Sequence, residues 1–544
     1  MLAGSLRGCC NGASAGGARS PCAVARAAAA ARRGRRRRGA ALPSRAAPGG
    51  ADGGSFEADV VVVGAGVIGL CIAHQLLQDT PLSVALIDRQ QPCAGATGAG
   101  QGYIWMAHRS PESPLWDLAV RSRGAWERFV ADNPELAEAM QWQTTGSLLL
   151  ATTGAEMTQL EARATMLQAN GVEGVRLLAR DAVLREEPAL GLPASAAGLL
   201  VESDAQISGR AAAFALLDEC QRLGAATGRC RVLLHEGVVA LEPGAAGAGA
   251  VVVTESGRRV RSRRGVVVAS GVWSGHLLAA ASGDARWRSL LAPRRGHLLE
   301  IARPEGMPPI RRGVMELSYT RHYAPAEASR AAAEEAAEAA ETARAGPAEC
   351  APGAPTGGGG SSSSGCDAEE DAARVDITFT ATTSASGTLL IGSSREFSGW
   401  HAAPDSAVMT AIMRRAHGFA PALSPALLDA ARAAGGGPGG GASVRVGLRP
   451  YALGGLPAIG PVPGLDGVFV AAGHEGSGLS LAPATAELVL QQLGAAPGGG
   501  GGGAAAQDAF LPELRLRAAA EAAGGGGGGG GTGAAAEAAG AARR

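Results

Sequence analysis

The sequence contains no lysine, and all 49 of its basic residues are arginine. This absence excludes a lysine Schiff base and a P-loop lysine from any mechanism. Aromatic residues are also scarce, with 7 Trp, 4 Tyr and 8 Phe among 544 residues, and all lie between Phe56 and Tyr323 or between Phe379 and Phe510. Segments without large apolar side chains cannot offset the entropy of ordering. We therefore expect a folded part of roughly 400 residues.

The chain has no net charge, because 49 acidic residues balance the 49 basic ones. This balance argues against nucleic-acid binding. Ten of the arginines fall in residues 1–51, which contain no acid and are rich in Ala and Ser. That composition, without the apolar region of a secretory signal, predicts an organelle transit peptide over 1–51. A basic disordered tail is the alternative interpretation.

Long apolar runs and paired cysteines are missing too. No stretch reaches 18 uninterrupted apolar residues, so no membrane span is expected. None of the nine cysteines forms a CxxC pair, and no Cys/His cluster has the spacing of metal ligands. We expect neither a metal site nor a disulfide framework.

Two long segments lack the composition of a folded core. Residues 324–373 are rich first in Ala and Glu and then in Gly and Ser, without an aromatic residue, and indicate a disordered insert at a hairpin tip. Residues 496–544, with their glycine runs, are predicted to form a low-complexity tail. The repetition is compositional, since no fixed period is present.

The first motif follows an apolar run, Val60–Val63, and reads Gly64-Ala65-Gly66-Val67-Ile68-Gly69. Helical apolar spacing continues from Leu70 to Gln78, and a second apolar run, Leu82–Ile87, ends at Asp88. This order predicts a βαβ unit in which the glycines permit a tight turn and close approach of a pyrophosphate. A carboxylate such as Asp88 suits ribose hydroxyls. A glycine-rich turn without a ligand is the alternative, and the motif alone does not separate FAD from NAD.

Four later segments narrow the choice: Ala94–Gly102, Val266–Trp273, Gly447–Pro450 and Ala472–Gly478. In order and spacing they resemble the FAD-dependent D-amino-acid oxidase and glycine oxidase family over about residues 57–495. The resemblance implies an α/β fold with a Rossmann-like FAD-binding domain, built on a mainly parallel sheet, and an interleaved antiparallel-sheet substrate domain. The implied ranges are 56–110, 200–285 and 445–495 for FAD binding, and 111–199 and 286–432 for the substrate domain. The likeness to plant-type members favours a chloroplast over a mitochondrion.

The resemblance also implies a cofactor site. Asp88 and Arg89 would hold the FAD pyrophosphate and ribose with the glycine turn, and Val238 would meet the adenine through its backbone. The segment His474–Ser480 would pass the isoalloxazine and open a helix over Pro483–Leu493. No cysteine lies between Gly447 and Leu493, which argues against covalent attachment of FAD. The implied cofactor-binding set is Gly64, Ala65, Gly66, Val67, Ile68, Gly69, Asp88, Arg89, Ala96, Thr97, Gln101, Gly102, Val238, Gly271, Gly473, His474, Glu475, Gly476, Ser477, Gly478 and Leu479.

For the substrate, Arg449 matches the family's carboxylate-binding arginine. A guanidinium binds a carboxylate through a rigid fork, which would fix an amino acid over the flavin. Tyr319 and Tyr323 resemble the tyrosine pair that borders the substrate pocket, although a core-packed strand would also place aromatics there. His474 is expected to position the backbone rather than transfer protons.

The resemblance therefore implies oxidation of the C–N bond of a small amino acid, of the D-amino acid, glycine or N-methyl glycine type. Hydride transfer to flavin N5 would be followed by imine hydrolysis, with oxygen or a quinone as electron acceptor. Gly454 and Gly476 stand where relatives have Asp and Arg, which leaves the substrate open. The alternative is a catalytically reduced flavoprotein that acts as an organellar assembly or scaffold factor. The late motifs argue against an NAD-dependent dehydrogenase, and the oligomeric state stays open.

Overall fold

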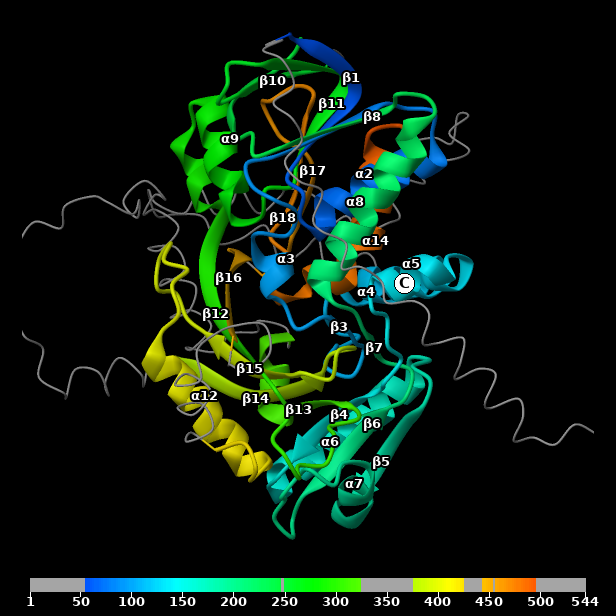
Figure 1. Cartoon of the computed structure of the whole chain (residues 1–544), viewed down its shortest axis with the longest axis vertical. Helices are drawn as coiled ribbons and strands as arrows, with labels where there is room; N and C mark the ends of the chain where they lie inside the picture. Colours follow the sequence, from blue (N-terminus) through cyan, green and yellow to red (C-terminus); the bar gives the residue numbers. More distant parts are fainter. Residues whose placement is uncertain (1–53, 246–248, 324–374, 425–442, 454, 496–544) are drawn as a thin grey trace, which may run out of the picture. The chain divides into compact units, whose positions relative to one another are not determined.

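The first sheet is built around β1 (Phe56–Val63), whose residues Val60–Val63 are buried. Its strand order is β17-β18-β11-β1-β2-β8, and β1 runs parallel to both neighbours. Strands β9 and β10 extend it in antiparallel fashion from β11 (Figure 1). The other strands are β2 (Val84–Asp88), β8 (Cys230–Leu234), β9 (Val238–Glu242), β10 (Val251–Thr254), β11 (Arg259–Val268), β17 (Ala458–Pro461) and β18 (Val468–Ala472).

The computed structural model describes residues 54–245, 249–323, 375–424, 443–453 and 455–495. The predicted transit peptide, the insert, the tail and Gly454 lie outside these residues, so those interpretations stay predictions. Among the described residues, no helix is both long and apolar enough to cross a membrane.

Helices α2 (Val67–Asp79), α8 (Gly209–Ala225), α14 (Gly478–Gln492) and α4 (Trp116–Asp132) pack together beside the first sheet. The sequence predicted the last helix only from Pro483, and that boundary was wrong. Proline lacks the N–H that would bond to the carbonyl of Leu479. The indole N–H of Trp126 on α4 donates to that carbonyl instead, at 2.9 Å. The helix therefore tolerates an internal proline and begins at Gly478.

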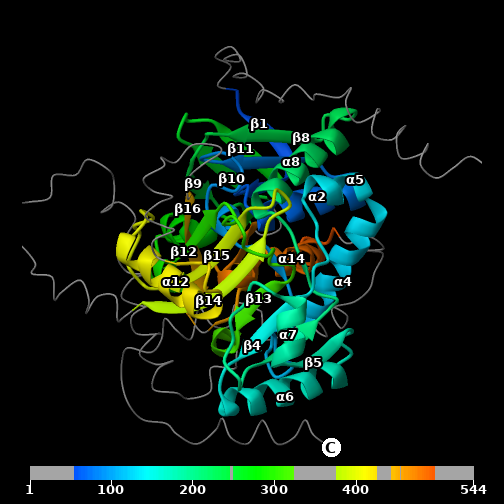
Figure 2. The ribbon, with the colours of Figure 1, turned by 60° about the horizontal axis from the view of Figure 1, so that its bottom comes forward.

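The second sheet has the order β16-β12-β15-β14-β13-β4-β6-β5 and is antiparallel except where β13 meets β4 (Figure 2). Helix α12 (Ser406–Phe419) packs on β14 and β15, while α6 (Gly154–Ala169) and α7 (Arg180–Glu186) contact β5. The two sheets confirm the predicted fold class. The strands are β4 (Ser147–Ala151), β5 (Val175–Ala179), β6 (Ala197–Val201), β12 (Leu291–Ile301), β13 (Gly313–Glu316), β14 (Asp376–Thr383), β15 (Leu389–Arg395) and β16 (Ser443–Ala452).

The remaining elements of the described residues are short. They are α3 (Ala96–Ala99), β3 (Tyr103–Ile104), α5 (Pro134–Ala139), β7 (Ala205–Gln206) and α9 (Ser274–Ser282), with 3₁₀ turns at Gly271–Trp273, Ala285–Leu290, Leu317–Tyr323 and Glu475–Ser477.

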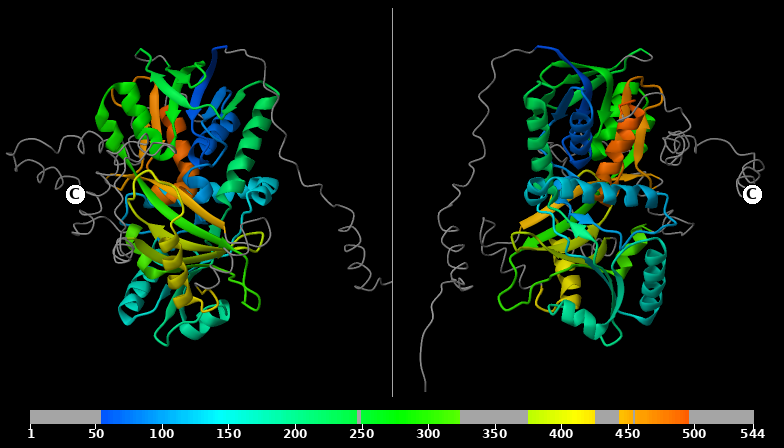
Figure 3. Two further views of the ribbon diagram at one scale, coloured as in Figure 1. Left: turned by 60° about the vertical axis from the view of Figure 1, so that its left-hand side comes forward. Right: turned by 90° about the vertical axis from the view of Figure 1, so that its right-hand side faces the viewer.

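Two elements fall on the other side of the predicted domain division. Strand β16 lies in the range predicted for FAD binding but pairs along its whole length with β12 of the second sheet (Figure 3). Helix α4 lies in the range predicted for the substrate domain but packs on α14. Strand β16 therefore carries a second-sheet residue, Arg449, next to the segment that opens α14, since Tyr451 forms a β-bridge with His474.

Candidate functional site

The glycine turn after β1 has a shape that side chains would prevent. Gly64 has φ +116°, and a Cβ there would lie 2.4 Å from the carbonyl oxygen of Ala269. A Cβ on Gly69 would lie 2.0 Å from the carbonyl oxygen of Gly64. Both obstacles are backbone atoms. Glycine at position 64 therefore lets the turn lie against the end of β11, and glycine at position 69 lets α2 approach the turn.

Asp88, at the end of β2, stabilises this turn by hydrogen bonds. Its carboxylate accepts hydrogen bonds from the backbone N–H of Ala65 at 2.6 Å and of Gln90 at 2.8 Å. Burial raises the pKa of Asp88, although both hydrogen bonds favour the ionised form. Each carboxylate oxygen has a second lone pair, which leaves acceptor capacity for a hydroxyl group.

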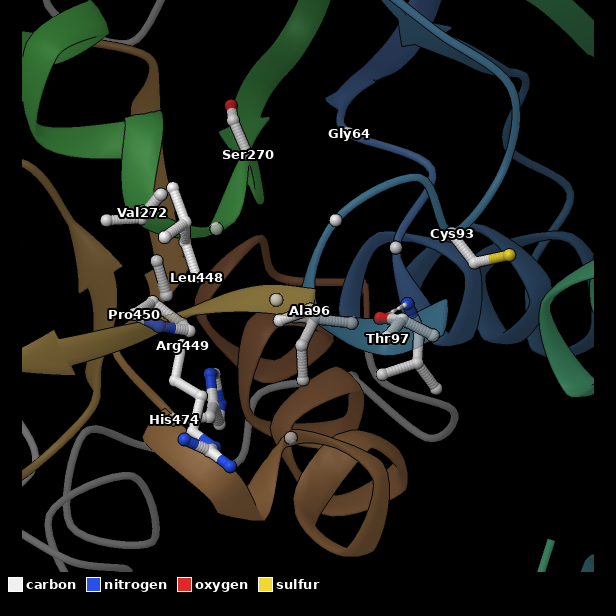
Figure 4. A pocket seen from close by; sticks show the side chains of 18 of the residues that line it. Gly64, Cys93, Ala96, Thr97, Ser270, Val272, Leu448, Arg449, Pro450 and His474 are labelled. Atoms are coloured by element: carbon white, nitrogen blue, oxygen red, sulfur yellow. Dashed lines mark hydrogen bonds between the residues drawn. The ribbon is translucent and has the colours of Figure 1, made fainter. Parts of the chain in front are cut away.

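A cavity of about 460 Å³ runs from the glycine turn to the strand β16. In Figure 4, Gly64, Thr97 and Cys93 lie at one side of it and Arg449 and His474 at the other. The predicted site residues that line it are Gly64, Gly66, Val67, Ile68, Asp88, Arg89, Ala96, Thr97, Gln101, Gly102, Val238, Gly271, Tyr319, Arg449, His474, Glu475, Gly476, Gly478 and Leu479.

Five predicted residues do not line the cavity in the described structure. Ala65 and Gly69 instead support the turn, through the hydrogen bond to Asp88 and the close packing described above. Gly473 and Ser477 lie in the segment that leads into α14. The side chain of Tyr323 lies outside the described residues.

The middle of the cavity joins the two sheets. The hydroxyl of Thr97 accepts the backbone N–H of Val67 at 3.1 Å. The side chain of Gln101 donates to the carbonyl of Leu390 at 3.0 Å and accepts from the hydroxyl of Thr380 at 2.8 Å. Gln101 therefore both lines the cavity and forms hydrogen bonds to the second sheet.

Arg449 points from β16 across the neighbouring strand. Its guanidinium lies over Gly296 on β12, where a Cβ would come within 2.1 Å of its Nη1. The same nitrogen donates to the carbonyl of Ser394 at 3.0 Å. Burial lowers the pKa of Arg449, but from so high a value that the group stays charged.

His297 helps to place that carbonyl. The backbone N–H of Asp405 donates to His297 Nε2 at 3.1 Å, so the ring proton is on Nδ1, which lies 3.0 Å from the hydroxyl oxygen of Ser394. Burial lowers the pKa of His297 to about 4. The ring is neutral near neutral pH, and it fixes the residue whose carbonyl holds Arg449.

His474 is held in a similar way. The hydroxyl of Thr485 donates to the carbonyl of Leu481 at 2.9 Å, so it accepts from His474 Nε2, which lies 3.0 Å away. Burial lowers the pKa of His474 to about 3. The ring is therefore neutral near neutral pH and is hydrogen-bonded to Thr485 of α14, and the backbone-positioning role expected from the sequence stays a prediction.

Glu475 brings a carboxylate to the Arg449 end of the cavity. Its φ is +46°, and its Oε1 lies 3.7 Å from Arg395 Nε, 3.8 Å from Arg294 Nη1 and 4.0 Å from Arg449 Nε. Burial alone would raise its pKa, but the three guanidinium charges outweigh that effect and lower the pKa to about 2.

Sequence reasoning missed Arg294 and Arg395, and it treated Glu475 only as part of the cofactor segment. It also missed several lining residues, namely Ser270, Val272, Trp273, Gly296, His297 and Gly447. Of these, Ser270, Val272, Trp273 and Gly447 lie inside quoted motifs, so the motif itself was the available signal. No local signal distinguishes the two arginines from the many others in the chain.

The comparisons with known proteins agree with this geometry. The model of the FAD dependent oxidoreductase family matches residues 59–492. This chain belongs to that family.

Curated relatives of the chain include enzymes of two activities. The chain is 27% identical to L-2-hydroxyglutarate dehydrogenase of Salmonella houtenae over 45% of its length, and 30% identical to glycine oxidase of Geobacillus kaustophilus over 40%. It spans about half the length of these two relatives, 54% and 56%. A glycine oxidase of Bacillus licheniformis is 23% identical over 81% of this chain and 94% of its own. The solved glycine oxidase of Geobacillus kaustophilus has the same fold, with a TM-score of 0.58, 22% identity, and coverage of 80% and 94%.

The site of this family member fits FAD, the family's cofactor. Gly66, Val67 and Ile68 put the N-terminus of α2 on the cavity wall, where backbone N–H groups and the helix dipole favour a pyrophosphate. A Cβ on Gly271 would meet no atom within 4 Å, so this glycine leaves open space beside the cavity. Among the described residues, no group of His, Cys, Asp and Glu could hold a metal ion.

Proposed function

We propose that the protein oxidises the C–N bond of a small amino acid. The observation that carries the proposal is the position of Arg449, which reaches the cavity from the second sheet while the glycine turn lies at the other end. A guanidinium fork at that place can hold a substrate carboxylate in two parallel hydrogen bonds and fix the α-carbon. Bound FAD supplies the hydride acceptor for this chemistry.

The protein's own groups suit an amine that arrives neutral. Two histidines line the cavity at its Arg449 end, His297 and His474, and both are uncharged near neutral pH. Glu475 stays ionised and close to arginines. An amine that has already lost its proton needs no general base for loss of the α-hydrogen, and the imine then hydrolyses in water. Oxygen or a quinone is the proposed electron acceptor.

A second candidate is oxidation of a 2-hydroxy acid, which the likeness to L-2-hydroxyglutarate dehydrogenase supports. Arg449 would bind the carboxylate of such a substrate in the same way. The scaffold alternative remains a third hypothesis. We also propose an organellar location on the composition of residues 1–51. The resemblance to plant-type members favours the chloroplast, with a mitochondrion as the alternative.

One experiment tests the proposed reaction directly. The purified protein should be yellow, and one or more members of a panel of D- and L-amino acids, glycine and sarcosine should bleach the flavin band under anaerobic conditions. Ammonia or methylamine release should match the flavin reduced. If only 2-hydroxy acids bleach the flavin, the second candidate function is supported and C–N oxidation is wrong. If no compound bleaches the flavin, the scaffold hypothesis is favoured.

The pH dependence of kcat/KM should be set by the amine pKa of the substrate and not by a group of the protein. Because His297 and His474 titrate near pH 4 and 3, kcat/KM should rise with pH until the substrate's own amine pKa is reached. Two substrates whose amines differ in pKa should shift the rising limb by that difference. A limb that stays at one pH for both substrates would show that a group of the enzyme titrates instead.

Substitution Gly296→Ala should disturb Arg449 without touching the FAD end. The new Cβ would lie 2.1 Å from the guanidinium, which would have to move away from the carbonyl of Ser394. We expect KM for the substrate to rise about tenfold or more, equivalent to roughly 1.4 kcal/mol, with flavin content unchanged. Steady-state kinetics and the flavin-to-protein ratio check this. Gly418→Ala is the matched control, because a Cβ there meets nothing within 4 Å.

A further inference from the structure

The two segments that flank the glycine turn are joined by a stacked pair of side chains. In the first sheet β1 lies between β11 and β2, so the turn after β1 lies between the turn after β11 and the loop after β2. In Figure 4, Ser270 and Cys93 mark these two segments on opposite sides of Gly64. The guanidinium of Arg89, the first residue after β2, lies over the ring of Trp273, 4.0 Å from the ring centroid.

A second contact shows that the indole reaches across the same gap. A Cβ at Gly95, in the loop after β2, would lie 3.7 Å from Cζ3 of Trp273, which is an ordinary van der Waals distance. Arg89, Gly95 and Trp273 all line the cavity, as do Gly64 and Gly66 of the turn between the two flanks. The pair therefore closes the part of the cavity where the N-terminus of α2 favours a pyrophosphate.

The two members of the pair are held with different firmness. The buried ring of Trp400, in the segment between β15 and α12, lies 6.1 Å from the ring of Trp273 and 4.9 Å from that of His276. Arg89 is exposed, and in the described part of the chain its guanidinium makes no hydrogen bond or ion pair. Exposed side chains change rotamer within nanoseconds. The stack can therefore open by movement of Arg89 while the indole stays in place.

We propose that the stack of Arg89 on Trp273 is a closure that controls how fast FAD enters and leaves the protein. While the stack is closed, the crevice at the glycine turn is covered between its two flanks, and FAD passes when Arg89 leaves the ring. Removal of either partner should therefore speed the release of FAD, and removal of the second partner should add nothing. The inference concerns the cofactor, and it holds for any substrate.

A double-mutant cycle on the full-length holoenzyme tests the closure, with Arg89→Gln, Trp273→Leu and the two combined. Release is followed by fluorescence with a phosphodiesterase that cleaves only released FAD, to the brighter FMN. Each single variant should release FAD about two- to fivefold faster than wild type, which is the effect of one cation–π contact at an exposed position. The double variant should release FAD no faster than the faster single variant.

Conservative variants and a control show whether the stack itself causes the effect. Arg89→Lys keeps a cation and Trp273→Phe keeps a ring, so they should release FAD more slowly than Arg89→Gln and Trp273→Leu. Arg231→Gln is the matched control, because Arg231 lies 4.2 Å over the ring of Phe56 in the same sheet but outside the cavity lining. It should leave the release rate unchanged.

The association rate of FAD with the apoprotein keeps the test decisive if Trp273→Leu fails to fold. The closure predicts that Arg89→Gln binds FAD at least as fast as wild type. An arginine that acted only on the pyrophosphate would attract it, so its loss would slow association.

Three results would overturn the inference. One is unchanged release in both single variants, which would show that the stack does not cover the path of FAD. Another is an equal effect of Arg89→Gln in the wild-type and Trp273→Leu proteins, and the third is slower association of FAD with Arg89→Gln. Because every readout is binding or release of FAD, a failure of the proposed C–N oxidation cannot imitate any of them.

Discussion

Replacement of Arg449 by alanine is expected to lower kcat/KM for the carboxylate substrate by about a thousandfold. Truncating one partner of a buried, hydrogen-bonded charge pair costs about 2–5 kcal/mol, which corresponds to roughly 30-fold to several thousandfold. We expect the upper part of that range, because Arg449 lines the cavity and is largely shielded from water. FAD content should not change, since the glycine turn and Asp88 lie at the other end. Single-turnover flavin reduction at varied substrate concentration measures the effect.

Two further variants show whether the loss is caused by the missing guanidinium fork of Arg449. Arg449→Lys keeps the charge but not the planar fork, so it should recover only part of the loss. Arg445→Gln lies on the same strand, where Arg445 bonds to Glu300 at 2.7 Å, outside the cavity lining, and should leave kcat/KM within about threefold. Equal activity of Arg449→Ala and wild type would remove Arg449 from the substrate site. Wild-type protein without any oxidation, combined with loss of an organelle complex in the variant, would favour the scaffold hypothesis.

The nucleotide end of the cavity could be predicted because its parts are close together in the sequence. The strand, the glycine turn and the helix run from Phe56 to Asp79 without interruption, and Asp88 reaches back only to Ala65. Each glycine is required by a steric contact with a nearby part of the chain. The glycine spacing in the sequence therefore predicts the geometry of the turn. The first strand, the first helix and the second strand accordingly began and ended within a few residues of the predicted bounds.

The substrate end could not be predicted to the same depth, because it depends on strand register. Arg449 faces Gly296 only because β16 pairs with β12, and Arg395 joins them only because β15 is the next strand. Neither pairing leaves a local pattern around these arginines. Tyr319 is a related case: it lies in a 3₁₀ turn rather than a strand, packed under Arg395 and at the edge of the ring of His108.

The start of α14 depends on a residue that is distant in the sequence. Proline normally stands in the first turn of a helix, and the family resemblance had implied a helix that begins at Pro483. The indole of Trp126, more than 350 positions earlier, satisfies the carbonyl that Pro483 leaves without a donor. The extra turn places Gly478 and Leu479 at the cavity wall, next to Glu475 and Gly476.

Substitution Gly69→Ala should abolish retention of FAD. The added Cβ would lie 2.0 Å from the carbonyl oxygen of Gly64 and 3.2 Å from Val62 Cγ1, and the first of these atoms is backbone that no side-chain rotation can move. Either α2 must shift away from β1 or the turn must open, and both changes displace the N–H groups that face the pyrophosphate. Overpacking of this kind costs about 1–3 kcal/mol or more, so FAD affinity should fall at least about tenfold and purified protein should be largely colourless.

Gly154→Ala is the matched control for that variant, because Gly154 opens α6 in the second-sheet region and a Cβ there would meet nothing within 4 Å. It should keep a full complement of FAD and the wild-type melting temperature. Fluorescence titration of both apoproteins with FAD, together with far-UV circular dichroism, separates a lost binding site from a lost fold. A Gly69→Ala protein that binds FAD as tightly as Gly154→Ala would show that the turn tolerates a side chain. Other groups of the cavity would then have to hold the pyrophosphate, and Arg89, which follows Asp88 on the cavity wall, is a cationic candidate.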